Sequence, residues 1–289
     1  MIPAQFEYHA PTSVQEALQL LRTYGADAKL MAGGHSLLPL MKFRLATPAH
    51  LVDLGRIPSL RYIKEDGRQV AIGAMATHWM IESSDLLRQR VPLLPEAAAQ
   101  IGDVQVRNMG TIGGSLAHAD PAADYPAAAL ALEAEIVAEG PGGRRTIGAA
   151  DFFTGLYATA LTPEEILVEI RVPLQAARMG TAYLKMAHPA SGFAVVGVAA
   201  LVTLDAQGRC ERARLGVTGV GSVAYRARAT EDRLIGKALD AKTVAVAAES
   251  AADGVDVNAD VFASSEYRRH LAIVFVRRAV QKALDRVKG

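Results

Sequence analysis

Cysteine is nearly absent from this chain of 289 residues, which has only Cys210. One cysteine excludes an internal disulfide framework, an iron–sulfur cluster held by cysteines of this chain, and a cysteine-cluster zinc site. We expect Cys210 to be a buried or idle thiol. Such cysteine usage is typical of a cytoplasmic protein.

An excess of charge of either sign is also lacking. The sequence has 31 basic and 30 acidic residues, which are interleaved and give a formal net charge of +1. This balance argues against nucleic acid or an anionic membrane surface as the main partner. No apolar run approaches the roughly 20 residues of a membrane span, and residues 1–6 lack the layout of a signal peptide. We therefore expect a soluble cytoplasmic protein with no membrane span.

Hydrophobic residues make up 51% of the sequence, which is enough for sizeable cores in two domains or one large one. Ser13 and Glu16 have the spacing of a capping box before an apolar pattern of helical period, and Gly25 is a plausible helix stop. Strands are expected at 28–31 and 49–54. These elements predict a small α+β lobe over residues 1–56.

A second lobe is expected over residues 57–176, and residues 1–176 together would form one domain. It would begin with a hairpin turned at Asp66-Gly67. The strands expected in this lobe are 60–63, 69–72, 134–138, 145–147 and 166–172, and the helices are 79–87, 93–101 and 126–132.

The hydrophobic pattern of strands and helices is less regular around 174–180, and we place a domain boundary between residues 176 and 177. Strands followed by helices then predict an α+β domain over residues 177–289. The expected strands are 181–186, 194–204 and 212–220, and the expected helices are 227–235, 242–252 and 266–287. The basic residues of the last helix are most simply a solvated surface.

Two glycine loops about eighty residues apart carry the clearest chemical signal. The first is Ala32-Gly33-Gly34-His35-Ser36, and the second is Arg107-Asn108-Met109-Gly110-Thr111-Ile112-Gly113-Gly114-Ser115. Successive backbone N–H groups and a nearby hydroxyl suit phosphate oxygens, and the second loop adds a cation and an amide. Neither loop is a Walker loop or the dinucleotide fingerprint of the doubly wound fold. Together they predict a phosphate-bearing cofactor held from two sides.

Other chemistries fit less well. His35, His118 and Asp120 could suggest a metal, but no third nitrogen or sulfur ligand has a diagnostic spacing, so no metal site is expected. A serine-hydrolase interpretation of Gly34-His35-Ser36 fails because no nucleophile elbow exists. From composition alone, Lys185 would extend its amine to solvent.

The loops, in this order and context, resemble those of the FAD-binding subunit of the molybdenum hydroxylases, the xanthine dehydrogenase family. The resemblance is closest to the medium subunit of aerobic carbon monoxide dehydrogenase. It covers nearly the whole chain. The supporting segments are residues 6–17, 32–39, 73–77, 106–115, 121–124, 164–167 and 193–199.

The resemblance implies a two-lobed FAD-binding domain of the vanillyl-alcohol-oxidase-like α+β fold, followed by a C-terminal domain with a small antiparallel sheet and helices. FAD would lie between the lobes, with its diphosphate against both loops. Asp124 would accept from ribityl or ribose hydroxyls, and Ile101 and Leu167 would pack on rings. The implied FAD-contacting residues are Leu30, Met31, Ala32, Gly33, Gly34, His35, Ser36, Leu37, Thr77, Ile101, Thr111, Ile112, Gly113, Gly114, Ser115, Asp124, Leu167 and Lys185. Residues 187–192 depart from the family pattern, which leaves local contacts open.

The implied function is electron transfer by an oxidoreductase subunit. Electrons would leave a substrate at a molybdenum cofactor on a large subunit, pass [2Fe-2S] clusters on a small subunit, and reach FAD here. An external acceptor (oxygen, a quinone, NAD or a carrier protein) would take them. The resemblance also implies a dimer of heterotrimers. We assign no acid–base or nucleophilic residue, because the flavin carries the chemistry.

Two alternatives remain at this point. A self-sufficient flavin oxidase could carry FAD on His35, although aromatic residues, at 6%, are few for a separate substrate domain. A non-enzymatic module with a vestigial flavin site would keep the fold without the cofactor.

Overall fold

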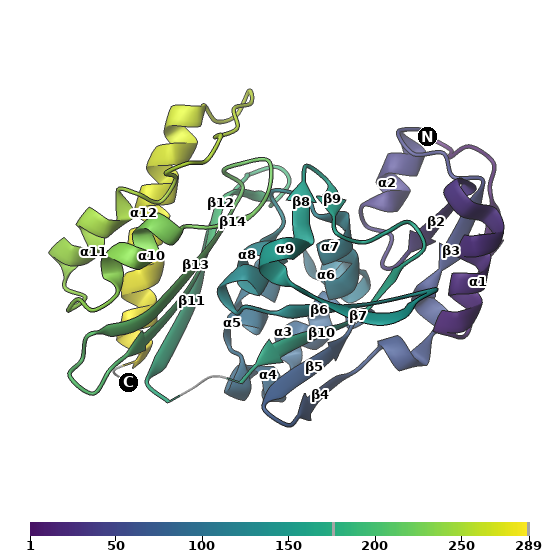
Figure 1. Ribbon diagram of the computed structural model, residues 1–289. Helices are drawn as coiled ribbons and strands as arrows, with labels where there is room; N and C mark the ends of the chain where they lie inside the picture. The colour runs from purple at the N-terminus through teal and green to yellow at the C-terminus, as the bar shows by residue number, and fades with distance from the viewer. Residues whose placement is uncertain (175–176, 288–289) are drawn as a thin grey trace.

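The computed structural model describes residues 1–174 and 177–287 (Figure 1). The expected domain boundary between residues 176 and 177 falls at the edge of a segment, 175–176, outside the described residues. Figure 1 shows the N-terminal lobe at one end, a central sheet, and the C-terminal domain with α12 (Ser265–Val287) at the other end. None of the helices in the described ranges is both long and apolar enough to cross a membrane.

The first lobe has a parallel sheet in the order β1-β3-β2. Its strands are β1 (Glu7–His9), β2 (Ala28–Met31) and β3 (His50–Asp53). Helix α1 (Val14–Tyr24) buries its apolar stripe in the core of this lobe, because residues three and four apart lie on one helix face. Ser13 caps its start by accepting from the N–H of Glu16 at 3.1 Å, and Gly25 ends it with φ +53°, so both predicted helix boundaries are confirmed.

Ser13→Ala should lower the free energy of unfolding by about 1 kcal/mol, because the N–H of Glu16 loses its acceptor. Chemical denaturation followed by circular dichroism measures the change. Ser13→Asp, which restores a capping acceptor, should recover most of the loss. An alanine variant as stable as the parent would show that this cap contributes nothing.

The central sheet has the strand order β4-β5-β10-β6-β7, with antiparallel neighbours. The hairpin predicted at Asp66-Gly67 is present, and β6 and β7 form a second one. The first hairpin begins at residue 63 rather than 60, because Pro58 starts a 3₁₀ turn that ends at Leu60. The strands are β4 (Ile63–Asp66), β5 (Gln69–Gly73), β6 (Glu135–Gly140), β7 (Gly143–Gly148) and β10 (Ile166–Pro173).

Short helices connect β5 to β6. The helix expected over 79–87 is two helices, because Ser84 caps a new one through the N–H of Leu87. The helices of this stretch are α3 (His78–Ser83), α4 (Asp85–Arg90), α5 (Leu93–Ala98), α6 (Val104–Met109), α7 (Ile112–His118) and α8 (Asp124–Ala131). The remaining short elements of the first 174 residues are α2 (Leu37–Lys42), α9 (Ala149–Phe152), β8 (Phe153–Gly155), β9 (Ala158–Thr159) and the 3₁₀ turns Gly25–Asp27, Leu54–Arg56 and Pro58–Leu60.

The C-terminal sheet has the order β11-β12-β13-β14 and is covered on both faces. Helix α12, with α10 (Arg228–Leu234) and α11 (Ala241–Ala248), lies on one face (Figure 1), and α8 packs on the other. Burial on both faces explains why the run from 194 to 204 is almost wholly apolar. The strands are β11 (Met179–Ala187), β12 (Ala194–Leu204), β13 (Cys210–Thr218) and β14 (Tyr225–Arg226). Each predicted strand and helix of this domain is present, but the helix expected over 242–252 ends at Ala248 and the strand expected over 212–220 spans Cys210–Thr218.

Candidate functional site

The two glycine loops lie against each other. A Cβ atom added at Gly33 would stand 2.1 Å from the carbonyl oxygen of Met109 and 2.7 Å from Cα of Gly110. The Cβ position of Gly114 is 3.2 Å from Cβ of Ala32. Only glycine fits at position 33 without moving backbone. The fold thus brings together two segments that the sequence separates, as one ligand shared by both loops requires.

The first loop presents backbone donors. Gly34 has φ +74°, in the left-handed region. Within the described chain, the N–H groups of Gly33, Gly34, His35 and Ser36 donate to no protein acceptor, and these residues are partly or fully exposed. Successive free amides in a tight turn form an anion-binding nest, so this loop fits the diphosphate of FAD.

The second loop has a different role from the one expected. Residues 112–118 form helix α7, and its first N–H groups already have protein acceptors. Gly113 donates to the carbonyl of Ala74 at 2.9 Å, and Gly114 donates to Oγ1 of Thr111 at 3.1 Å. Ile112 and Ser115 donate to Ala76 and Thr111. The prediction of a second row of free amides is therefore wrong, because two of these N–H groups bond the segment after β5 and the other two bond Thr111, the cap of α7.

The cation and the amide of the second loop also point elsewhere. Arg107 pairs with Glu82 at 2.8 Å and donates to the carbonyls of Ile101 and Gly102. Asn108 donates to the carbonyl of Val104, one helical turn earlier, at 2.8 Å. The expectation that these side chains suit a phosphate is wrong in this structure. They hold α6 in place beside the first loop.

Thr77 and Thr111 fix the second loop to the central domain. Thr77 caps α3 through the N–H of Met80 and forms a β-bridge with Thr111, which is 3% exposed. The position of Gly113 requires glycine because a Cβ there would stand 2.6 Å from the carbonyl oxygen of Ala74. The loop is thus a rigid support against which the first loop rests.

His78 lies beneath the second loop and was not predicted from sequence. Its backbone N–H donates to the carbonyl of Gly110 at 2.9 Å, and its ring centroid lies 5.3 Å from that of Tyr125. The side chain is buried, and Nδ1 has no hydrogen-bond partner. Burial, with smaller contributions from His35 and Arg107, lowers the pKa of His78 to about 4. The folded protein therefore holds a neutral imidazole at this position.

The free energy of unfolding should fall as the pH drops from about 6.5 to about 4, because the unfolded chain binds a proton on His78 before the folded chain does. The depressed pKa sets the sign, and its size sets an upper limit of about 3 kcal/mol. His78→Gln should remove this part of the pH dependence, as measured by urea unfolding across that range. An unchanged pH profile in the variant would contradict the assignment.

Asp124, at the start of α8, and Lys185, on β11, form a buried ion pair. Nζ of Lys185 lies 2.9 Å from Oδ1 of Asp124 and donates to the carbonyls of Gln100 and Gly192. Tyr183 donates its hydroxyl hydrogen to Oδ1 of Asp124 at 2.6 Å. Burial raises the pKa of Asp124, and Lys185 and Tyr183 oppose that shift. The expectation that Lys185 reaches solvent is wrong, since its side chain is 2% exposed.

The remaining predicted contacts are spread around these groups. Leu30 and Met31 are on β2, which leads into the first loop, and Leu37 opens α2 directly after it. Ile101 is partly buried, and Leu167 is buried on β10. In the described chain, no hydrogen bond joins the Asp124–Lys185 pair to either glycine loop. Direct contact of these residues with FAD stays a prediction.

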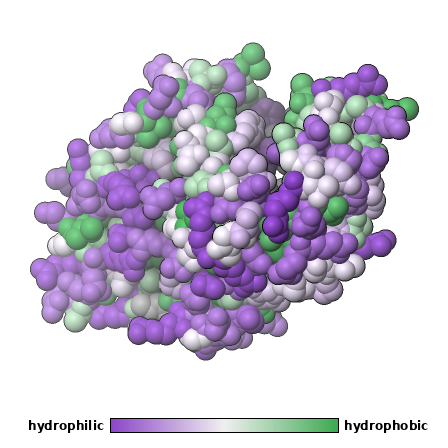
Figure 2. Space-filling model, turned by 45° about the vertical axis from the view of Figure 1, so that its right-hand side comes forward, coloured by the Kyte–Doolittle hydropathy of each residue, from purple (hydrophilic) through white to green (hydrophobic). Residues whose placement is uncertain are grey.

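The surface around the first lobe is notched. Figure 2 shows a hollow between the N-terminal part, at the upper right, and the rest of the molecule, with apolar residues on the N-terminal side. Exposed apolar side chains near α2 include Leu38, Phe43 and Leu45. They follow the first loop directly, so part of the surface beside this loop is apolar, as is typical of pockets that bind ring systems.

Two cavities lie away from the first glycine loop. A cavity of about 370 Å³ lies beside Glu133 and Arg226, away from the glycine loops, and Arg226 there pairs with Glu231 at 2.6 Å. A smaller cavity of about 260 Å³ is lined by Asp120, Tyr157 and Phe193. It adjoins the segment that leads into Asp124, a predicted FAD contact, so it is the cavity more relevant to the candidate site.

Comparison with known proteins agrees with this geometry. Residues 4–175 match the family described as the FAD binding domain in molybdopterin dehydrogenase. Residues 181–283 match the CO dehydrogenase flavoprotein C-terminal domain. The chain belongs to this family of FAD-binding subunits. Its resemblance to the medium subunits of molybdenum hydroxylases, as stated from the sequence, is confirmed.

Relatives of this family match the chain from end to end. The carbon monoxide dehydrogenase medium chain of Hydrogenophaga pseudoflava is 46% identical over 286 residues, which cover 99% of both chains. The xanthine dehydrogenase FAD-binding subunit of Escherichia coli O157:H7 is 28% identical, with 98% of this chain and 97% of that one covered. A solved structure of carbon monoxide dehydrogenase from Hydrogenophaga pseudoflava superposes with a TM-score of 0.96 at 47% identity over 99% of each chain. The expected α+β fold, FAD cofactor and oxidoreductase class are thereby confirmed.

Proposed function

We propose that this chain relays electrons through FAD, from iron–sulfur clusters of a small subunit to an external acceptor, beside a molybdenum-binding large subunit. The relatives that support this are named as medium chains or subunits of dehydrogenases. The assembly would be a dimer of heterotrimers. The observation that carries the proposal is the contact of the two glycine loops, one of which has a row of free amides.

The residues of this chain would bind and orient the cofactor. The N–H groups of residues 33–36 would donate to diphosphate oxygens, each such bond to a charged acceptor contributing about 1.5–3 kcal/mol. Helix α7 would hold the first loop in position, and Ser115 would offer its hydroxyl. When bound, the flavin supplies one- and two-electron redox chemistry. No side chain of the protein is needed as an acid or a base.

Cys210 supports the placement of the clusters on a partner. The thiol is 1% exposed, in the core of the C-terminal domain, and burial raises its pKa to about 11. A cluster ligand must be a thiolate that can reach the iron. Because this is the one cysteine of the sequence, the iron–sulfur clusters of the proposed electron path lie on another chain.

Expression of the tagged chain, alone and with the proteins encoded beside it, tests the proposal. We expect one FAD per chain in both preparations, and iron and molybdenum only in the co-purified complex. Reduction by the partner's substrate should bleach the flavin only in the complex. A chain that takes up no FAD, or that turns over substrate alone, would contradict the proposal.

Acid precipitation separates the proposal from the oxidase alternative. Flavin should remain in the supernatant, since the proposal requires no covalent bond to His35. Flavin that stays with the protein would favour the oxidase.

Mixing reduced complex with oxygen, a quinone or NAD, and following flavin reoxidation, identifies the acceptor. The cytoplasmic location stays a prediction.

A further inference from the structure

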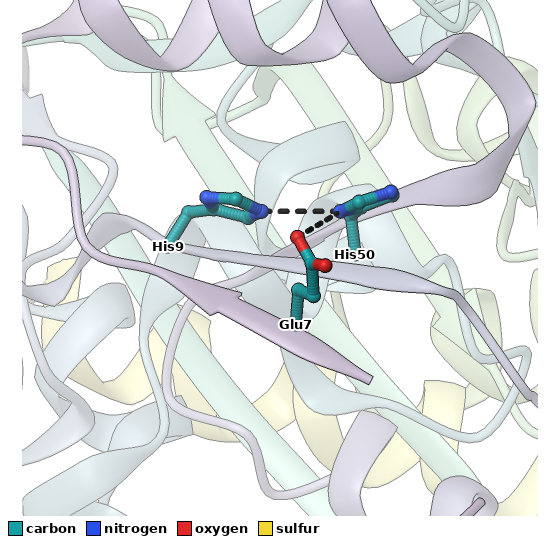
Figure 3. A group of neighbouring side chains, drawn as sticks. All are labelled: Glu7, His9 and His50. Carbon is teal, nitrogen blue, oxygen red and sulfur yellow. Dashed lines mark hydrogen bonds and ion pairs between the residues drawn. The ribbon is translucent and has the colours of Figure 1, made fainter. Parts of the chain in front are cut away.

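Glu7, His9 and His50 gather on the first lobe, away from the glycine loops in sequence (Figure 3). Nε2 of His9 lies 3.1 Å from Nδ1 of His50, and Oε2 of Glu7 lies 3.5 Å from the same nitrogen. One ligand atom from each residue lies within 4.8 Å of those of the other two. Figure 3 shows the three side chains converging from two neighbouring segments.

The parallel pairing of β1 with β3 produces this convergence. Glu7 pairs directly with His50, and His9 follows Glu7 by two residues, so all three side chains leave the same face of the sheet. The N–H of Glu7 also donates to the carbonyl of Ala49 at 2.8 Å, which fixes the start of β1. The backbone of each residue is therefore held by the sheet.

The His50 ring is held in place as well. It stacks on Tyr24, the last residue of α1, with ring centroids 3.6 Å apart and planes 14° from parallel. The His9 ring lies 5.1 Å from the same tyrosine. The Glu7 side chain is 72% exposed, so the cluster is open on one side. Two imidazoles in fixed positions beside a carboxylate that can adjust resemble a prearranged ligand set.

The separations match those around a small divalent ion. Ligand atoms about 2.0–2.1 Å from tetrahedral zinc are roughly 3.4 Å from one another. The distances from Nδ1 of His50 to Nε2 of His9 and to Oε2 of Glu7, 3.1 and 3.5 Å, bracket that value. Two imidazoles and one carboxylate are a known donor set for Zn²⁺ and related ions, with a remaining position for water.

We propose that Glu7, His9 and His50 bind one divalent transition-metal ion of the Zn²⁺ type, which ties the edge strand β1 to β3. This site is separate from the proposed electron transfer. Sequence alone could not reveal it, because His9 and His50 are 41 residues apart and only the strand register aligns them.

Titration of the full-length, FAD-loaded chain with ZnCl₂ by isothermal calorimetry tests the site. We expect one equivalent to bind, and the affinity to fall more than tenfold in His9→Ala and in His50→Ala. The control His270→Ala, which removes an exposed histidine of α12, should bind as the parent does. Co²⁺ added in place of Zn²⁺ should give visible absorption that both variants at β1 and β3 lose.

FAD content and circular dichroism of each variant report whether it folds. If His50→Ala fails to fold, the more conservative His9→Gln and Glu7→Gln variants carry the test, with the same loss of affinity expected. Absence of stoichiometric binding in the parent would overturn the proposal, and so would binding that survives both His9→Gln and Glu7→Gln. In either case the three residues would form only a hydrogen-bonded surface cluster.

Discussion

Gly33→Ala should weaken FAD binding by about 100-fold or more. The added Cβ would stand 2.1 Å from the carbonyl oxygen of Met109, so the two glycine loops must move apart. Movement of the first loop would misplace its free N–H groups, and loss of two bonds to the diphosphate costs at least about 3 kcal/mol. Quenching of flavin fluorescence during titration of the apoprotein with FAD measures the change.

Gly142→Ala is the matched control. Gly142 lies at the turn between β6 and β7, and a Cβ there would meet no atom within 4 Å. This variant should bind FAD as the parent does. Circular dichroism would show whether Gly33→Ala remains folded. A folded Gly33→Ala protein with unchanged affinity would show that the first loop does not hold the diphosphate.

The regular elements were largely predictable because local patterns specify them. The helix beginning after Ser13 is capped and ended by residues in its own sequence, and the run from 194 to 204 is apolar because both faces of β12 are buried. Helix α7 was missed for a physical reason. Gly113 and Gly114 disfavour helix by local propensity, and the close approach to Ala74 that requires Gly113 is a tertiary contact.

Partners of the candidate site residues were harder to predict than their identity. Arg107 was expected beside a phosphate, but it forms an ion pair with Glu82, which lies on a different helix. From composition alone Lys185 was expected at the surface, but Asp124, which is 61 residues away in sequence, meets it in the interior. A sequence shows which residues can bind phosphate or form ion pairs. Which partner each one has depends on packing between distant segments.

Lys185→Met should lower the free energy of unfolding by about 3–5 kcal/mol. Removal of the amine leaves the carboxylate of Asp124 buried without its cation, and an uncompensated buried charge is costly. Met retains most of the side-chain volume, so little of the loss comes from a cavity. Urea unfolding followed by circular dichroism measures the effect. The ion pair also joins α8 to β11, so FAD affinity should be measured in the same samples.

The exposed pair of Lys282 with Glu96 provides the control for that substitution. Lys282→Met removes a contact of 2.6 Å, but the lysine is 41% exposed and Arg286 still pairs with Glu96. The free energy of unfolding of Lys282→Met should fall by less than about 1 kcal/mol.

Acidic pH should narrow the difference in the free energy of unfolding between Lys185→Met and the parent. Burial raises the pKa of Asp124, and the variant lacks the amine that opposes this shift, so its carboxyl takes up a proton more readily. A group with a raised folded-state pKa favours the folded state at low pH and loses that contribution as the pH rises through the folded-state pKa. The loss of unfolding free energy in Lys185→Met should therefore be largest at neutral pH and smaller near pH ~4. A deficit independent of pH would indicate that lost packing, rather than the unpaired carboxylate, destabilises the variant.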